Sequence, residues 1–143
     1  MPDAELARLA AKGFRGVRFH FMKHLGEGHD VGRVLDLTPR LAKAGLHLQV
    51  HFASELVHTV GRELPKSAVP VVIDHMGRVD ALKGERHEDF QALMKLLEKP
   101  NMHVKVSGID RIDSGARPGD GYPADRKSTR LNSSHITISY AVF

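Results

Sequence analysis

Four short stretches with the side-chain pattern of β-strands recur along the chain. Residues 46–52 alternate strictly between apolar and polar side chains, which is typical of a strand with one buried face. Residues 71–73 are all β-branched, as expected for a strand that is buried on both faces. The stretches begin roughly 25 to 30 residues apart, which is the length of one strand–helix unit. The predicted strands are 14–21, 46–52, 71–73 and 102–107.

Apolar residues at helical spacing occupy the intervals between these stretches. We expect Asp3 and Ser54 to cap the first and third helices. In the second helix, Thr38 and Pro39 resemble an N-cap followed by a first-turn proline, which predicts that this helix is broken or begins late. The predicted helices are 3–12, 34–44, 54–64 and 87–98. The last of them has an apolar stripe of Phe90, Leu93, Met94 and Leu97.

The alternation of helix and strand predicts the fold class. Right-handed crossovers between successive strands make all of them parallel, which indicates an α/β protein. Within that class we predict part of a (β/α)8 TIM-type barrel with about four βα units. A complete barrel takes about 250 residues, so a chain of 143 residues is about half of one. A doubly wound parallel sheet is the alternative, although no Gly-rich phosphate loop follows any predicted strand.

Two segments differ in their composition. We expect residues 1–125 to be an internal fragment of the barrel. Residues 126–143 are rich in Ser and Thr, contain no acidic residue and match neither the helical nor the strand period. We expect this tail to be non-native, as in translated sequencing-adapter read-through, and to have no part in the function. A genuine C-terminal strand at 136–142 is the less favoured alternative.

Composition restricts the classes of function. The content of 41% hydrophobic and 27% charged residues is that of a soluble globular protein. The net charge of +4 comes mostly from the basic tail, so it is weak evidence for a nucleic-acid partner. The chain has no cysteine, no apolar run of membrane-spanning length and no signal-peptide pattern at its N-terminus. We therefore expect a cytoplasmic protein with no nucleic-acid or membrane partner.

Polar residues follow each predicted strand at its carboxyl end. The third strand runs directly into the motif Asp-His-Met-Gly-Arg at 74–78. In parallel α/β folds this end of the strands is where ligands bind. Arg side chains bind carboxylates in a bidentate manner, and imidazoles polarise carbonyls or transfer protons. We therefore predict a site for an anionic, carbonyl-bearing substrate, with Arg18, His51, His75 and Arg111 as its candidate residues.

Two other interpretations of these residues remain open. An Asp–His pair at 74–75 also occurs in turns that have no catalytic role. A zinc site formed by His20, His51 and His75 is conceivable, because imidazoles are zinc ligands. The chain has no His-x-His or His-Glu-x-x-His motif, however, and nearby Arg side chains would repel a dication. We therefore expect no metal and no cofactor.

Four motifs together resemble one family. They are Gly-Val-Arg-Phe at 16–19 followed by Lys23, Leu-Gln-Val-His at 48–51, Asp-His-Met-Gly-Arg-Val-Asp at 74–80, and Val-Lys-Val-Ser-Gly-Ile-Asp-Arg-Ile at 104–112. In these motifs the chain resembles the amidohydrolase superfamily, in particular its metal-independent lactonase branch, typified by 2-pyrone-4,6-dicarboxylate lactonase. The resemblance covers roughly residues 2–125 and implies a (β/α)8 barrel that hydrolyses a cyclic ester with water, in the breakdown of aromatic compounds.

The resemblance also implies roles for individual residues. A histidine at the position of His75 lies near the lactone carbonyl, and arginines at the positions of Arg18 and Arg111 hold substrate carboxylates. The chain departs from the family pattern at His24, where an arginine is usual, and at His51, where a tyrosine is common. The His-x-His of the first strand and the Asp base of the last strand have no counterpart.

These observations lead to one leading hypothesis and two rivals. We expect a fragment of a hydrolase that opens a small dicarboxylated lactone, with His75 catalytic and Arg18, His51 and Arg111 in substrate binding. The chain alone is expected to be inactive and to self-associate through exposed barrel edges. The rivals are a fragment of a metal-dependent amidohydrolase or decarboxylase and a non-catalytic, anion-binding half-barrel.

Overall fold

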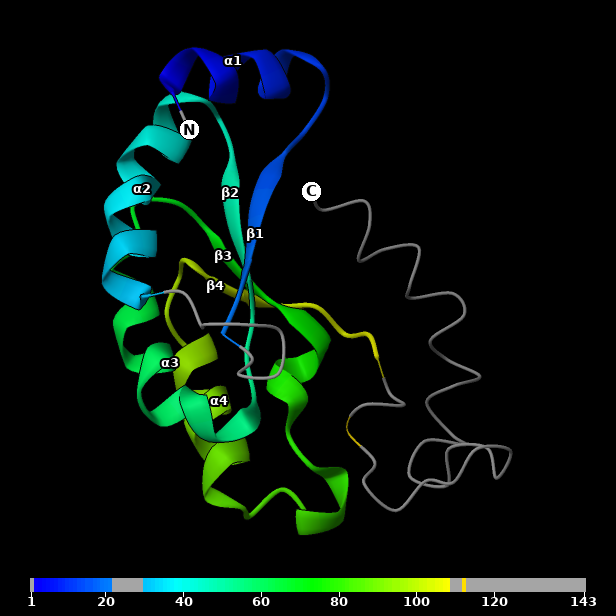
Figure 1. Cartoon of the computed structure of the whole chain (residues 1–143). Coiled ribbons are helices and arrows are strands. Elements are labelled where there is room, and N and C mark those ends of the chain that lie inside the picture. Colours follow the sequence, from blue (N-terminus) through cyan, green and yellow to red (C-terminus); the bar gives the residue numbers. More distant parts are fainter. Residues whose placement is uncertain (1, 22–29, 109–111, 113–143) are drawn as a thin grey trace.

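The computed structural model describes residues 2–21, 30–108 and 112. Its centre is a four-stranded sheet in the order β1-β2-β3-β4, and every neighbouring pair is parallel. The helices α2, α3 and α4 lie along one side of this sheet (Figure 1). Sequential strand order with helices on one face is the arrangement of a barrel wall, because a doubly wound sheet reverses its strand order and covers both faces. The strands are β1 (Gly16–His20), β2 (His47–His51), β3 (Val71–Ile73) and β4 (Met102–Val104).

The two faces of the sheet differ in polarity. Leu48 and Val50 on β2 are buried, and they align with Val71 and Ile73 on β3 in the same hydrophobic cluster. The intervening positions point to the opposite face, because side chains alternate along a strand. On that face the register aligns Arg18, Gln49, Val72 and His103. The core therefore lies between sheet and helices, and the other face carries mostly polar side chains.

Most of the predicted elements are present, with different ends. The helical segments are α1 (Asp3–Ala11), α2 (Val31–Lys43), η2 (Ser54–His58), α3 (Val60–Glu63), η3 (Leu64–Lys66), η4 (Asp74–Arg78), η5 (Ala81–Lys83) and α4 (Glu88–Leu97). Asp3 is not an N-cap, because it lies within the first turn and Pro2 precedes the helix. Within the described residues, no helix is long and apolar enough to cross a membrane.

The predicted break at Thr38 and Pro39 is wrong. Helix α2 runs through Pro39 without interruption and starts early, because the Asp30 side chain accepts hydrogen bonds from the backbone N–H groups of Gly32 and Arg33. Proline lacks the N–H that would bond the carbonyl four residues earlier, which belongs to Leu35. The buried Thr38 hydroxyl donates to that carbonyl at 2.7 Å and replaces the missing bond.

The predicted continuous helix at 54–64 is also wrong. The segment consists of the 3-10 turn η2 and the short helix α3, which are separated at Thr59 with φ −118° and ψ −75°. Ser54 does not cap it. Instead, the Ser54 side chain bonds Asp89 in the first turn of α4, and His58 Nε2 lies 2.8 Å from the same carboxylate. Tertiary contacts with α4 thus determine the local shape of this segment.

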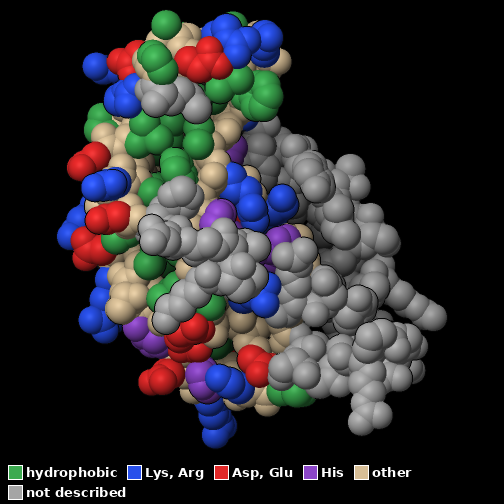
Figure 2. All heavy atoms as spheres, in the orientation of Figure 1, with side chains coloured by type: hydrophobic (Ala, Val, Ile, Leu, Met, Phe, Trp, Pro, Cys, Tyr) green, Lys and Arg blue, Asp and Glu red, His purple; other side chains and the backbone are tan. Residues whose placement is uncertain are grey.

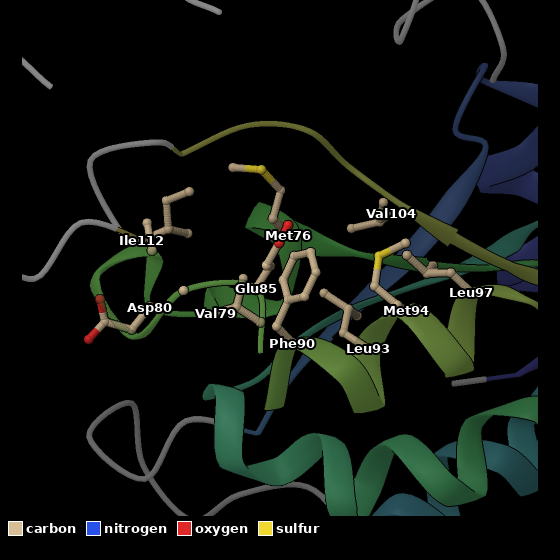
Figure 3. A pocket seen from close by; sticks show the side chains of 12 residues that line it. Met76, Val79, Asp80, Glu85, Phe90, Leu93, Met94, Leu97, Val104 and Ile112 are labelled. Atoms are coloured by element: carbon tan, nitrogen blue, oxygen red, sulfur yellow. The ribbon is translucent and has the colours of Figure 1, made fainter. Parts of the chain in front are cut away.

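Helix α4 has two apolar surfaces. Leu93 and Leu96 are buried against the core, so the predicted stripe is displaced by part of a turn. Phe90, Met94 and Leu97 line an apolar cavity of about 240 Å³ together with Met76 and Val104 (Figure 3). The cavity lies behind η4 and is lined by none of Arg18, His51 and His75. It is therefore separate from the polar face of the sheet.

We expect Thr38→Val to destabilise the chain by about 1 to 3 kcal/mol, because it leaves the Leu35 carbonyl without its donor. It also removes the acceptor that the Ala68 N–H uses at 3.1 Å. Urea unfolding monitored by circular dichroism measures the change. Thr38→Ser keeps the hydroxyl and should lose much less stability; equal losses in both variants would contradict this role of the hydroxyl.

Candidate active site

A polar cluster extends from the middle of β1 and the carboxyl half of β2 to the residues directly after β3. Its members are Arg18 from β1, Gln49 and His51 from β2, and Asp74 and His75 directly after β3. Figure 2 shows histidine and basic side chains gathered over this part of the sheet. Parallel strands bring their carboxyl ends to one edge, which explains why residues far apart in sequence meet here.

Asp74 is the buried centre of the cluster. It is 1% exposed, and both of its carboxylate oxygens accept hydrogen bonds from neighbouring strands. Arg18 Nε donates to Oδ2 at 2.7 Å, and Gln49 Nε2 donates to Oδ1 at 2.5 Å. The Arg18 side chain is 46% exposed, so its guanidinium is anchored by Nε while part of the group remains accessible. The arrangement fixes one edge of the guanidinium and leaves the other edge for an anion.

The turn after β3 has an unusual backbone. His75, Met76, Gly77 and Arg78 all have positive φ angles, of 52°, 52°, 62° and 53°. Three of the four are not glycine, and such conformations cost of order 1 kcal/mol or more each and persist only where their surroundings enforce them. The end of β4 provides that enforcement, because the Met76 N–H donates to the carbonyl of Lys105 at 3.1 Å. Backbone strain of this kind is concentrated at functional sites.

His51 and His75 are in direct contact. Their ring centroids lie 5.3 Å apart with an interplanar angle of 82°, an edge-to-face arrangement. His75 Nδ1 also lies 3.0 Å from Ser107 Oγ. His51 is 4% exposed, and neither of its ring nitrogens has a hydrogen-bond partner in the part of the chain that the structure describes. A buried polar group without a partner is costly, which marks His51 as a group that a ligand would satisfy.

Burial lowers the pKa of His51 to about 4, and electrostatic interactions with Arg18, His75 and Arg78 act in the same direction, with Asp74 opposing them. His51 is therefore neutral near pH 7. A neutral imidazole has one N–H donor and one acceptor nitrogen. The site consequently combines a cationic group, Arg18, with a neutral group that both donates and accepts.

The structure brings together three of the four residues predicted from sequence. His51 contacts His75, and Arg18 is held by Asp74, which precedes His75 in the chain. Arg111, with Lys23 and His24, lies outside the described residues. The roles of all four in binding or catalysis stay predictions. Sequence reasoning missed Gln49, although the strict alternation of 46–52 places it on the same face of the strand as His51.

The candidate zinc ligands do not form a cluster. Among the described residues, the group that brings three ligand atoms within 4.8 Å of one another is His58, Glu88 and Asp89. That group lies at the N-terminus of α4, where a helix dipole already stabilises two carboxylates. His20, His51 and His75 make no such group, and His51 is surrounded by cationic side chains. The expectation of no metal at the polar cluster stays a prediction.

Comparison with known proteins identifies similar chains. A family model described as "Amidohydrolase" matches residues 1–136, a range that extends past residue 125. The chain is 36% identical over 115 residues to the 4-sulfomuconolactone hydrolase of Hydrogenophaga intermedia, covering 78% of this chain and 38% of that protein. It is 35% identical over 111 residues to the 2-pyrone-4,6-dicarboxylate hydrolase of Comamonas testosteroni, covering 77% of this chain and 36% of that protein.

Solved structures show the same similarity. A protein from Pseudomonas putida designated a 2-pyrone-4,6-dicarboxylic acid hydrolase superposes with a TM-score of 0.69 and 32% identity, over 82% of this chain and 42% of that one. A protein of the same designation from Acinetobacter baumannii, with citric acid bound, superposes with a TM-score of 0.67 and 26% identity. The match covers 80% of this chain and 43% of that one. These neighbours confirm the prediction of a partial TIM-type barrel. The chain spans about two fifths of the length of these relatives.

We expect His51 to titrate near pH 4, measured by the pH dependence of its ring signals in NMR. In the unfolded chain His51 binds a proton below about pH 6.5, whereas in the folded chain it stays neutral down to about pH 4. This group therefore lowers the stability of the fold as the pH falls from about 6.5 to 4. His51→Gln should therefore stabilise the chain relative to wild type at pH 4.5 more than at pH 7.5. His103→Gln, an exposed change of the same kind, is the control. A pH-independent difference for His51→Gln would contradict burial of a neutral imidazole.

We expect Asp74→Asn to cost about 2 to 3 kcal/mol of unfolding free energy, because the amide NH2 would oppose one of the donors from Arg18 and Gln49. Asp3→Asn is a matched control. It removes an exposed pair with Arg40 and should cost less than about 1 kcal/mol. Urea titrations of both variants test the difference, and equal effects would argue against a structural role for Asp74.

Proposed function

Because the chain belongs to the amidohydrolase family, we propose that its polar cluster is part of the substrate pocket of an enzyme that hydrolyses a small carboxylated lactone. The observation that supports this most directly is the combination of an anchored guanidinium with two imidazoles at one sheet edge. A lactone with carboxylates presents the complementary groups, namely an anion and a carbonyl oxygen.

Each described residue has a distinct part in this proposal. The accessible edge of Arg18 binds one substrate carboxylate in a bidentate manner, and Asp74 keeps the guanidinium in place. His75 polarises the lactone carbonyl, which stabilises the negative charge that develops when water attacks. His51 donates a neutral hydrogen bond to the guest, and Arg111 binds a second carboxylate.

Asp74 is not the group that activates water. Both of its oxygens are engaged with cationic or amide donors, so the carboxylate is held in a binding role. A general base for the attacking water needs an oxygen within hydrogen-bond reach of that water, and both oxygens of Asp74 already accept bonds from Arg18 and Gln49. We therefore infer that the described residues bind and polarise the substrate without turning it over.

The relatives support a particular class of lactone. Their names refer to 2-pyrone-4,6-dicarboxylate and 4-sulfomuconolactone, which are both small lactones with anionic substituents. The neighbour with bound citric acid holds a small polycarboxylate. The shared chemistry is a small ring ester with more than one anionic group. We propose the same class for this chain, and aromatic-compound breakdown as its context.

Two further proposals concern the chain as a whole. Strands β1 and β4 end the described sheet, and each pairs with one neighbour only within the described residues. Open strand edges are templates for pairing, so we propose self-association through them. We also propose a cytoplasmic location, and a domain boundary at residue 125 followed by a non-native tail.

Calorimetry with 2-pyrone-4,6-dicarboxylate tests the binding proposal. We expect the full 143-residue chain to bind it, and Arg18→Met to weaken binding about tenfold or more, because a charge-assisted hydrogen-bond pair is lost. Arg62→Met, an exposed arginine on α3, is the control and should bind as wild type does. Equal affinities of the Arg18 and Arg62 variants would refute the assignment of Arg18.

The absorbance of the pyrone ring reports hydrolysis in the same samples. We expect no turnover by the chain alone, since no described carboxylate of the polar cluster is placed as a base. Hydrolysis that disappears on His75→Ala would show that the chain carries a complete catalytic site and would overturn this inference.

A further inference from the structure

The Nδ1 edge of His75 faces the end of β4. Ser107 Oγ lies 3.0 Å from Nδ1. The backbone of Gly108 covers the same edge, because a β-carbon at position 108 would lie 2.5 Å from Nδ1 and 2.9 Å from Cγ. Gly108 also has φ of +67°, which side-chain-bearing residues rarely adopt. Residues 107–108 therefore pack closely against one edge of this ring.

Other contacts restrict the same ring. His51 packs against it edge to face, and the left-handed turn that carries His75 is tied to β4 by the Met76 N–H at the carbonyl of Lys105. The backbone of His75 and its side chain are thus both held by the segment that leaves β4. Because the Nδ1 edge of His75 faces residues 107–108, the geometry of imidazole directs its Nε2 edge away from them.

The partner of Nδ1 decides which nitrogen carries the proton in a neutral imidazole. A backbone carbonyl can only accept, so it would force the proton onto Nδ1. A serine hydroxyl can either donate or accept; when it donates, Nδ1 is the acceptor and the proton is on Nε2. An N–H on Nε2 is the form that donates to a carbonyl oxygen, which is what polarisation of a lactone requires.

We propose that Ser107 is a positioning residue for His75. Its hydroxyl donates to Nδ1 and keeps the ring as the Nε2–H tautomer, and Gly108 provides the space that this ring orientation needs. The inference rests on the proposed function, because it assigns the group that polarises the carbonyl. It adds a residue, Ser107, that touches neither the substrate nor the reacting atoms.

Long-range ¹H–¹⁵N NMR of the histidine rings in the full chain tests the tautomer without any ligand. We expect His75 of the wild type to have an unprotonated Nδ1 and a protonated Nε2. Ser107→Ala should give a mixture of tautomers, and Ser107→Thr, which keeps the hydroxyl, should restore the wild-type signals. Ser67→Ala removes a hydroxyl that bonds backbone groups elsewhere and should leave His75 unchanged.

Calorimetry with 2-pyrone-4,6-dicarboxylate on the same variants separates the two proposals. We expect Ser107→Ala to bind about fivefold more weakly and Ser107→Thr to bind as wild type does, as for the loss of one hydrogen bond. A wild-type His75 protonated on Nδ1, or a Ser107→Ala variant with unchanged tautomer, would overturn the role of Ser107. A wild type with the expected tautomer and no affinity for the dicarboxylate would instead refute the proposed function.

Discussion

The buried carboxylate of Asp74 holds the candidate site together. It is nearly inaccessible to solvent. It joins three strands, because it directly follows β3 and accepts hydrogen bonds from Arg18 on β1 and Gln49 on β2. An ionised carboxylate in such a place is stable only when its oxygens are satisfied. The two donors meet that requirement and, in return, are fixed in position. The position of the Arg18 guanidinium is therefore a consequence of how Asp74 is accommodated.

Two other features of the polar cluster raise the free energy of the folded chain. His75 lies in a left-handed turn, and His51 is buried with neither nitrogen bonded within the described residues. Both features oppose folding, and the hydrophobic layer between sheet and helices compensates for them. A guest that bonds His51 would recover part of this cost on binding. Under the proposed function, the site is thus arranged in advance for a ligand.

The sequence was sufficient to predict the parallel α/β fold and the place of the polar cluster, because period-two and helical patterns are local properties. It failed where a side-chain hydrogen bond, local at Thr38 and tertiary at Ser54 and Gln49, decided the structure. The Thr38 hydroxyl supplies the bond that Pro39 removes, so helix α2 continues where its pattern predicts a break. Ser54 bonds Asp89 instead of capping its own segment. Gln49 went unnoticed because its partner, Asp74, is 25 residues away in the chain.

The separation of the two sheet faces has an evolutionary consequence. Leu48, Val50, Val71 and Ile73 hold the fold from one face, whereas Arg18, Gln49 and His51 occupy the other. A mutation on the polar face leaves the apolar layer intact, but a change at Arg18 or Gln49 also removes a donor from the buried carboxylate of Asp74. The His51 ring lies on the same face but hydrogen-bonds no other described residue, so this side chain can change without breaking the bonds of Asp74. The architecture thereby allows ligand chemistry to vary most easily at polar-face positions outside the Asp74 network.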